Sequence, residues 1–263
     1  MSEMDAVREL VNKIRTANGL DPVLSAEEEK QAPPLPVCPV CGGSGWEPLG
    51  RDRDGYSWVK PCACVAVGQA RQRIKQSGLS DLLEQCTFDS FKTREPWQQE
   101  MARTAARYAD AVINGEKPWL FMGGQPGCGK THLCTAICGK LLNAGKGVKY
   151  AQWTEAAREL RGLSFDSTAF KNAIAPFMDA AVLYIDDLFK GQPGSKPSAT
   201  DGALAFEILN PRYFQTKPTI ISSEWTLSDL LNLDQGTFSR VRERAQGYII
   251  NIGADTGKNQ RFA

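Results

Sequence analysis

The stretch GGQPGCGKTH, residues 123–132, decides the fold of this chain. It contains the spacing G-x-x-x-x-G-K-T, in which glycines allow a curled loop whose backbone N–H groups point inward at phosphates. The loop follows the apolar run WLFM and precedes the apolar helical pattern THLCTAICGKLL, which is the context that a phosphate-binding loop requires. The pattern predicts a nucleoside triphosphate site; a chance glycine-rich turn is the alternative.

Each residue type in this loop has an expected role. Lys130 is predicted to reach the β- and γ-phosphates, and the hydroxyl of Thr131 is predicted to hold Mg²⁺. The helix that starts at the loop presents its positive dipole end to the phosphates. The residues expected to bind ATP and Mg²⁺ are Gly124, Gln125, Pro126, Gly127, Cys128, Gly129, Lys130, Thr131 and His132.

The run VLYIDDL, residues 182–188, supplies an acidic partner for the loop. Its apolar residues predict a buried strand that delivers two carboxylates to the edge of a sheet where ligands bind. Asp186 is expected to hold Mg²⁺, and Asp187 to orient or polarise the attacking water. By itself the pair would be a solvated turn, but the phosphate loop upstream favours the catalytic interpretation.

Apolar strand-like runs alternate with helical patterns from about residue 90 onward. Such alternation predicts an α/β fold, in which a parallel sheet is covered by helices on both faces. A later strand, KPTIISSE, ends in Ser222, Ser223 and Glu224, where a polar side chain can sense hydrolysis of the γ-phosphate. A simple strand-end turn with exposed hydroxyls is an equally good interpretation of this ending.

The pattern GTFSRVRERAQG predicts an amphipathic helix that carries Arg240, Arg242 and Arg244. Arg240 and Arg244 are four residues apart and therefore share a face of the helix. One of them can stabilise transition-state charge on the nucleotide of a neighbouring subunit, which is the role of an arginine finger. A solvated helix whose arginines pair with Glu243 is the alternative.

The composition of the 263 residues is that of a globular protein, with 42% hydrophobic and 23% charged residues. No apolar run is long enough to span a membrane, and the N-terminus lacks the apolar core of a secretory signal. We therefore expect a cytoplasmic protein. The formal net charge of +1 excludes an overall basic field, so any contact with nucleic acid must use local patches.

Four of the eight cysteines form two close pairs, CPVC and then, after 20 residues, CAC. Four thiolates at such spacing satisfy a tetrahedral Zn²⁺ ion, and a segment with little apolar core depends on the metal to fold. Four free cysteines in an unstructured arm are the alternative. The structural zinc site is expected to consist of Cys38, Cys41, Cys62 and Cys64.

Several stretches, taken in order, resemble the DnaC/DnaI family of helicase loaders, which are AAA+ ATPases, and the related transposition ATPase IstB. They are GQPGCGKTHL, VLYIDDL, FEILNPRYFQTKPTIISSE and FSRVRERA, preceded by CTFDSF, which resembles the entry to the ATPase domain in that family. The resemblance covers roughly residues 86–252. It implies an AAA+ P-loop core at residues 86–263 with a small zinc-binding module before it. From the helical spacing of Val7, Leu10, Val11 and Ile14 and from the prolines of residues 26–37, we expect residues 1–78 to contain an N-terminal helix, a linker and this module.

The resemblance also implies roles for single residues. Ser223 or Glu224 would be the sensor of the γ-phosphate, and Arg240 would be the arginine finger. Two positions depart from the family pattern. Many AAA+ proteins end the acidic motif in Asp-Glu, whereas the shorter Asp187 stands here and predicts slow hydrolysis. Glu224 occupies a position where an asparagine often serves as the sensor.

By resemblance, the chain is expected to load a replicative helicase. ATP would assemble protomers through their ATP sites around single-stranded DNA, while the zinc module grips a hexameric DnaB-type helicase for the initiation of replication. Residues 154–179 would form an inserted pair of helices that contributes to DNA contact, with Arg161 and Lys171 as candidates. Lys258 and Arg261 add a modest basic patch near the C-terminus.

Three alternative functions are compatible with these motifs. An IstB-like transposition ATPase shares the same core, and the zinc module favours the loader over it. A small-molecule kinase would need a lid with arginines and an acceptor pocket, and no clear lid is evident in the sequence. An adaptor that binds ATP without turning it over is compatible with the short Asp187 side chain.

Overall fold

The computed structural model describes residues 38, 40–42, 44–51, 57–62, 65, 79–191 and 196–260. The chain divides into two compact units, Met1–Val65 and Ala66–Ala263. The predicted N-terminal helix, Cys64 and Arg261 lie outside the described residues. The predicted domain limits, 1–78 and 86–263, remain predictions.

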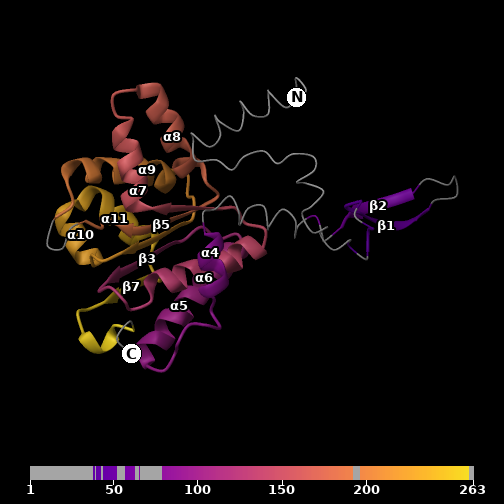
Figure 1. Ribbon diagram of the computed structural model, residues 1–263, viewed down its shortest axis with the longest axis horizontal. Coiled ribbons are helices and arrows are strands. Elements are labelled where there is room, and N and C mark those ends of the chain that lie inside the picture. The colour runs from indigo at the N-terminus through magenta and orange to yellow at the C-terminus, as the bar shows by residue number, and fades with distance from the viewer. Residues whose placement is uncertain are drawn as a thin grey trace, which may run out of the picture. The chain divides into compact units, whose positions relative to one another are not determined.

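A five-stranded parallel sheet forms the centre of the larger unit (Figure 1). Its strands are β3 (Trp119–Gly124), β4 (Val148–Gln152), β5 (Val182–Leu188), β6 (Thr219–Ser223) and β7 (Ile249–Ile252). Their order across the sheet is β4-β5-β6-β3-β7, and all four pairings are parallel, as the sequence predicts. The strand that leads into the phosphate loop, β3, therefore lies between β6 and β7.

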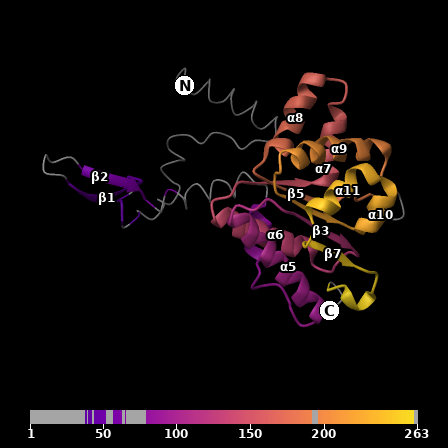
Figure 2. The ribbon, with the colours of Figure 1, turned by 180° about the vertical axis from the view of Figure 1, so that it is seen from behind.

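Helices cover both faces of this sheet (Figures 1 and 2). One face carries α4 (Ser80–Gln85), α5 (Pro96–Ile113) and α6 (Lys130–Asn143). The other face carries α7 (Trp153–Gly162), α8 (Ser167–Asp179), α9 (Ala199–Phe214), α10 (Leu227–Leu233) and α11 (Gln235–Arg244). A short 3-10 helix, η1 (Thr256–Lys258), follows β7.

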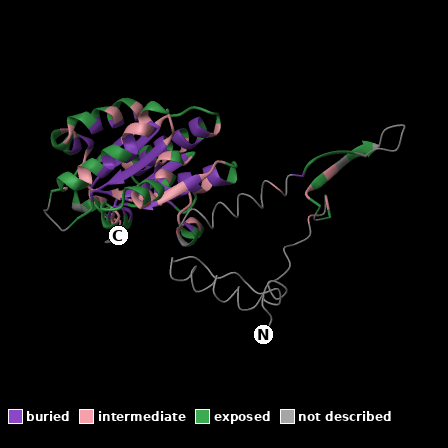
Figure 3. Cartoon of the chain, turned by 90° about the horizontal axis from the view of Figure 1, so that it is seen from above, coloured by how far each residue is buried: buried purple, intermediate pink, exposed green. Residues whose placement is uncertain are grey.

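The strands are buried on both sides because successive side chains point to opposite faces. In β3, Trp119 and Phe121 pack with the cluster under α7 to α11, while Leu120 and Met122 pack with the cluster under α5 and α6. Figure 3 shows the buried sheet between helices that are exposed on their outer sides. Within the part of the chain that the structure describes, no helix is both long and apolar enough to cross a bilayer.

A fully buried arginine joins α8, α9 and β6. Arg212, near the end of α9, donates hydrogen bonds of 2.6–3.2 Å to the carbonyls of Phe177, Met178, Ala180 and Pro218 and to the hydroxyl of Thr219. Burial lowers the pKa of Arg212 to about 10, so the guanidinium stays charged at neutral pH. It provides hydrogen-bond donors to the carbonyls at the end of α8, which the helix itself cannot satisfy.

In the smaller unit, β1 (Trp46–Arg51) and β2 (Ser57–Pro61) form an antiparallel hairpin with an irregular register between Pro48 and Gly50. Cys62 follows β2 directly, and its N–H donates to the carbonyl of Gly45 at 2.8 Å. This bond brings the chain after β2 back to the C-x2-C turn. The hairpin exposes large apolar side chains, namely Trp46, Leu49, Trp58 and Val59.

Candidate nucleotide site

The phosphate loop connects β3 to α6 at the carboxyl edge of the sheet. Gly124 and Gly127 have φ angles of 113° and 78°, in the left-handed region that favours glycine. A Cβ on Gly124 would lie 1.9 Å from the carbonyl oxygen of Ile252, so the loop runs directly against β7. The loop is therefore curled in the way that its glycines predict.

Lys130 is the first residue of α6, and its side chain folds back into the loop. It is 6% exposed, and Nζ donates to the carbonyl oxygens of Gly124 at 2.7 Å and Gln125 at 2.8 Å. A phosphate oxygen would replace these neutral acceptors with a charged one, and hydrogen bonds between charged groups are the stronger ones. The ammonium therefore lies within the phosphate loop, and its contact with a phosphate remains a prediction.

Asp186 is the polar centre of the site. The residue is 5% exposed, and its Oδ1 accepts hydrogen bonds from Ser222 at 2.5 Å, Tyr184 at 2.7 Å and Thr131 at 3.1 Å. The hydroxyl of Tyr150 donates to Oδ2 at 3.2 Å. Burial, together with the nearby Asp186 carboxylate, raises the pKa of both tyrosines, so they remain protonated donors. Four hydroxyls thus hold this buried carboxylate in place.

The residues around Asp186 fit a magnesium ion. Its carboxylate and the Thr131 hydroxyl are adjacent oxygen ligands, and Mg²⁺ prefers such ligands together with phosphate oxygens and water. With Mg²⁺ bound, these two side chains would hold it, and the ion would neutralise charge on the phosphates. The structure brings the two predicted magnesium ligands together, although they are 55 residues apart in the sequence.

Asp187 lies in a different environment from its neighbour. The register between β5 and β6 shifts after Ile185, and Asp187 adopts a left-handed φ of 54°, so the two carboxylates do not follow regular strand alternation. Lys190 donates to the Asp187 carboxylate at 2.6 Å and lies 3.4 Å from Glu224. The hydrogen bond to Asp187 raises the pKa of Lys190. Lys190 thus links the ends of β5 and β6.

The two serines at the end of β6 point in different directions. The Ser222 hydroxyl donates to Asp186 and accepts the N–H of Asp187 at 3.0 Å, so it contacts both acidic residues. The Ser223 hydroxyl instead donates to the carbonyl of Leu188 at 2.7 Å. The sensor role of Ser223 remains a prediction, and the structure adds Ser222 to the site.

The alternation of side chains along a strand predicts that Ser222 belongs to the site. Asp186 shares a face of β5 with Tyr184, and Tyr184 packs in the cluster next to α6. On β6, Ile220 packs in the same cluster, so Ser222, two residues later, belongs to this face. Counting in twos along both strands would have selected Ser222 from the sequence.

His132, predicted to bind nucleotide, contacts the segment that precedes α5. Its Nε2 lies 2.8 Å from the carbonyl of Thr87 and therefore carries the proton that it donates. Ser90 lies 3.2 Å from the same nitrogen, and the ring of Phe91 packs edge-on at 5.3 Å between centroids. His132 thus fixes residues 87–91 beside the start of α6, and its contact with nucleotide remains a prediction.

The candidate arginine fingers lie on α11, as predicted. Arg240 donates to the carbonyl of Gly236 and lies over the ring of Tyr213, with 5.7 Å between the guanidinium carbon and the ring centroid. Arg244 donates to the carbonyl of Lys117 at 2.6 Å. Both contacts of Arg240, with Gly236 and with Tyr213, involve residues near the surface. The choice between the two arginines remains a prediction.

The candidate DNA contacts lie on the inserted helices α7 and α8. Arg161, in the last turn of α7, forms an ion pair with Asp201 at 2.9 Å, and Lys171 is exposed on α8. Arg161 therefore has a protein partner that a DNA phosphate would have to displace. Lys171 has the more accessible charge of the two.

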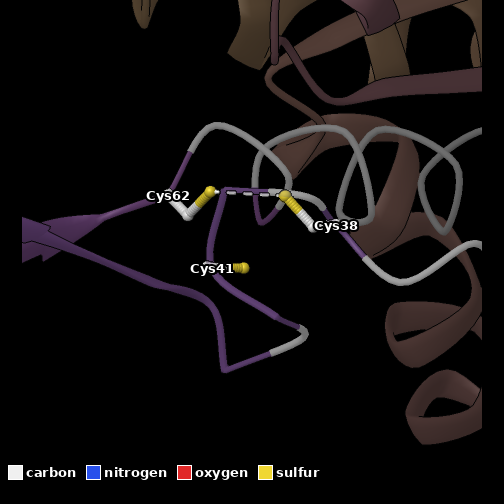
Figure 4. A group of neighbouring side chains, drawn as sticks. All are labelled: Cys38, Cys41 and Cys62. Carbon is white, nitrogen blue, oxygen red and sulfur yellow. Dashed lines mark hydrogen bonds between the residues drawn. The ribbon is translucent and has the colours of Figure 1, made fainter.

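In the smaller unit, three of the four predicted zinc ligands lie together. The sulfur atoms of Cys38, Cys41 and Cys62 all lie within 4.8 Å of one another, and those of Cys38 and Cys62 are 3.7 Å apart (Figure 4). The N–H of Gly42 donates to the Cys38 carbonyl at 2.8 Å, which closes the turn between the first two cysteines. This arrangement supplies a sulfur donor set of the kind that zinc prefers.

Comparison with known proteins identifies the family. The family described as IstB-like ATP binding protein matches residues 66–234, which include the phosphate loop and the acidic pair. The chain belongs to this family. Two relatives come from Bacillus subtilis (strain 168). The uncharacterized protein YqaM is 33% identical over 83% of this chain and 69% of YqaM, and the phage-like element PBSX protein XkdC is 31% identical over 76% of this chain and 77% of XkdC.

Other similar proteins have names that refer to DNA replication. The replicative helicase loader DnaC of Buchnera aphidicola (subsp. Acyrthosiphon pisum, strain APS) is 27% identical over 44% of this chain and 47% of DnaC. The match thus spans about half of that loader. A crystal structure of the DnaC helicase loader has a TM-score of 0.53 at 19% identity and covers 65% of this chain and 97% of that one. At this identity the likeness shows the fold alone.

Proposed function

We propose that this chain is an ATP-dependent helicase loader that binds a replicative DnaB-type helicase and single-stranded DNA during the initiation of replication. The observation that carries the proposal is the sequence match to the loader DnaC, in a chain whose Lys130 folds into the phosphate loop and whose Thr131 contacts Asp186. Membership of an ATP-binding family supports ATP as the nucleotide.

The site supports slow, regulated hydrolysis. Asp187 would orient the attacking water, but in the structure its carboxylate accepts a hydrogen bond from Lys190 at 2.6 Å. A carboxylate can accept several hydrogen bonds, so Asp187 could accept one from water while Lys190 holds its Oδ2 atom. Arg240 of a neighbouring protomer would supply positive charge at the γ-phosphate, so turnover would depend on self-association through the ATP sites.

The smaller unit is proposed to hold a structural zinc ion and to contact the helicase. With Zn–S distances near 2.3 Å, two sulfurs of a tetrahedral site lie about 3.8 Å apart, close to the 3.7 Å between Cys38 and Cys62. Cys64 would be the fourth ligand. The exposed Trp46 and Trp58 of the hairpin are the kind of side chains that dominate protein interfaces.

The second candidate function is that of an IstB-like transposition ATPase. It is favoured by the family description itself and by the same nucleotide site, which both functions need. The two differ in the partner that the chain recognises. A DnaB-type helicase is the partner of a loader, whereas the second candidate would act with a transposase.

Sedimentation of the chain with a purified hexameric DnaB-type helicase tests the proposal. With ATP and Mg²⁺, the wild type is expected to migrate with the helicase, and ATP turnover is expected to rise with single-stranded DNA and with protein concentration. Cys62→Ser should release zinc and abolish helicase binding, because the cysteine cluster orders the hairpin. Cys86→Ser, a matched change outside the cluster, should do neither. Wild-type protein that never binds the helicase would disprove the loader function.

A further inference from the structure

The segment that follows β7 returns to the phosphate loop. This segment, residues 253–260, which we call the C-terminal strap, is the yellow part of the chain after β7 in Figure 1. Gln125 and Asp255 form a reciprocal pair across it. Gln125 Nε2 donates to the Asp255 carbonyl at 2.8 Å, and the Asp255 N–H donates to Gln125 Oε1 at 2.5 Å. The pair fixes the first half of the strap beside the start of the loop.

A second set of contacts fixes the end of the strap to the middle of the loop. The N–H of Gln260 donates to the carbonyl of Gly127 at 2.9 Å, and Gln260 Nε2 donates to the carbonyl of Cys128 at 3.4 Å. The Oδ1 atom of Asn259 lies 1.9 Å from the position that a Cβ on Gly127 would occupy. A larger residue at position 127 would displace the Asn259 side chain, and the left-handed φ of 78° at Gly127 favours glycine independently.

The hydrogen bonds of the loop show what these contacts do. A phosphate site needs inward-facing N–H groups, and the carbonyls of such a loop then need partners elsewhere. In this loop, Lys130 donates to the carbonyls of Gly124 and Gln125, and Gln260 donates to those of Gly127 and Cys128. If Lys130 turns to a phosphate, it leaves its two carbonyls, whereas the bonds from the strap can remain.

We propose that the C-terminal strap is a positioning element that holds the phosphate loop in its curled, anion-binding conformation and thereby raises the affinity for ATP. Gln260, Asn259 and the pair of Gln125 with Asp255 are its positioning groups. The inference rests on the nucleotide site of the proposed function and adds an element that sets the affinity of that site for ATP. A strap that instead obstructs the site would lower the affinity for ATP, so the two roles predict effects of opposite sign.

Two substitutions at Gln260 in the full chain test the strap. Gln260→Pro removes both the N–H donor to Gly127 and the side chain, whereas Gln260→Ala removes the side chain alone. With a fluorescent ATP analogue and Mg²⁺, Gln260→Pro is expected to bind about tenfold more weakly than the wild type, and Gln260→Ala less than about threefold more weakly. The KM for ATP should rise by the same factors while kcat stays unchanged, because the strap contacts the loop and not the acidic pair.

Lys258→Ala is the matched control within the strap. Its ammonium lies 3.7 Å from the Asp255 carboxylate, and we expect this variant to bind ATP like the wild type. In hydrogen exchange without nucleotide, the amides of residues 125 and 127–129 should exchange faster in Gln260→Pro than in Lys258→Ala.

Two results would overturn the inference, and they are distinguishable. Gln260→Pro that binds ATP as tightly as the wild type, or more tightly, would refute the strap alone. A wild type that binds no ATP would refute the strap together with the nucleotide site on which the proposed function depends.

Discussion

The two units of the chain are stabilised in different ways. In the larger unit, a parallel sheet buries apolar side chains on both faces, and every residue of β3 is buried. Among the side chains of the smaller unit whose burial is described, Cys62 alone is buried, and the hairpin exposes two tryptophans. The larger unit can therefore fold by hydrophobic burial, whereas we expect the smaller unit to depend on metal binding by its cysteines.

Removal of zinc should have the largest effect of the changes considered, and it should unfold one unit without affecting the other. Structural zinc supplies about 10–16 kcal/mol at pH 7 in small zinc-dependent folds, so a chelator is expected to unfold the hairpin of residues 46–61 completely. The thermal transition of the larger unit and its affinity for ATP should not change. Zinc release and hydrogen exchange, measured on one sample, check this prediction. Protection of the hairpin amides after zinc has left would contradict it.

Arg212→Met should have the next largest effect, and only on the larger unit. The substitution leaves several buried carbonyls without donors, each at roughly 1–3 kcal/mol, so we expect a loss of more than about 3 kcal/mol in the free energy of unfolding. Denaturant titration measures the loss. Arg158→Met, at an exposed position on α7, is the matched control and should change stability by less than about 0.5 kcal/mol. If the two variants have equal free energies of unfolding, the Arg212 hydrogen bonds do not contribute to the stability of the larger unit.

Asp187→Asn should slow ATP hydrolysis without changing the fold of either unit. If Asp187 orients the attacking water, the variant is expected to hydrolyse ATP about 100-fold more slowly at an unchanged affinity for ATP. Steady-state turnover and direct binding of ATP distinguish the two effects. Asp187→Glu lengthens the side chain by one methylene and tests whether the short carboxylate limits the rate. If Asp187→Asn hydrolyses ATP at the wild-type rate, Asp187 has no catalytic role.

Lys190→Ala should change the free energy of unfolding only slightly, by less than about 1 kcal/mol, because the ion pairs of Lys190 are partly exposed. The pKa of Lys190 is raised in the folded protein, so its contribution is complete below the pKa of the unfolded chain. It is lost only as the pH rises through the higher folded value. The stability difference between the wild type and the variant should therefore be constant near neutral pH and vanish in strong alkali. A difference that is already lost at pH 8 would contradict this.

Much of the larger unit follows from patterns that are visible in the sequence. The apolar runs of β3, β5 and β6 and the glycine spacing of the loop fix the strands and the edge where the ligand binds. Strands that are buried on both faces require apolar residues, and left-handed backbone angles favour glycine. The sequence patterns predict neither α5 nor α10, because the residues of these helices contain no ligand-binding motif of their own.

Other features depend on contacts between residues that are distant in the sequence. Arg212 is charged and has no carboxylate next to it in the sequence, so its complete burial follows only from the carbonyls that α8 and β6 bring around it. The link from Lys190 to Glu224 requires β5 and β6 to be neighbours in the sheet. The strap on the phosphate loop requires the position of β7 beside β3. None of these contacts leaves a local pattern in the sequence.

Calorimetric titration with ATP and Mg²⁺ tests the central claim, that the curled loop and the buried Asp186 carboxylate form one nucleotide site. We predict one ATP bound per chain in the wild type and in the zinc-free protein, with binding lost in Lys130→Ala. A wild type that produces no binding signal, or a Lys130→Ala variant that binds ATP as tightly as the wild type, would contradict the claim.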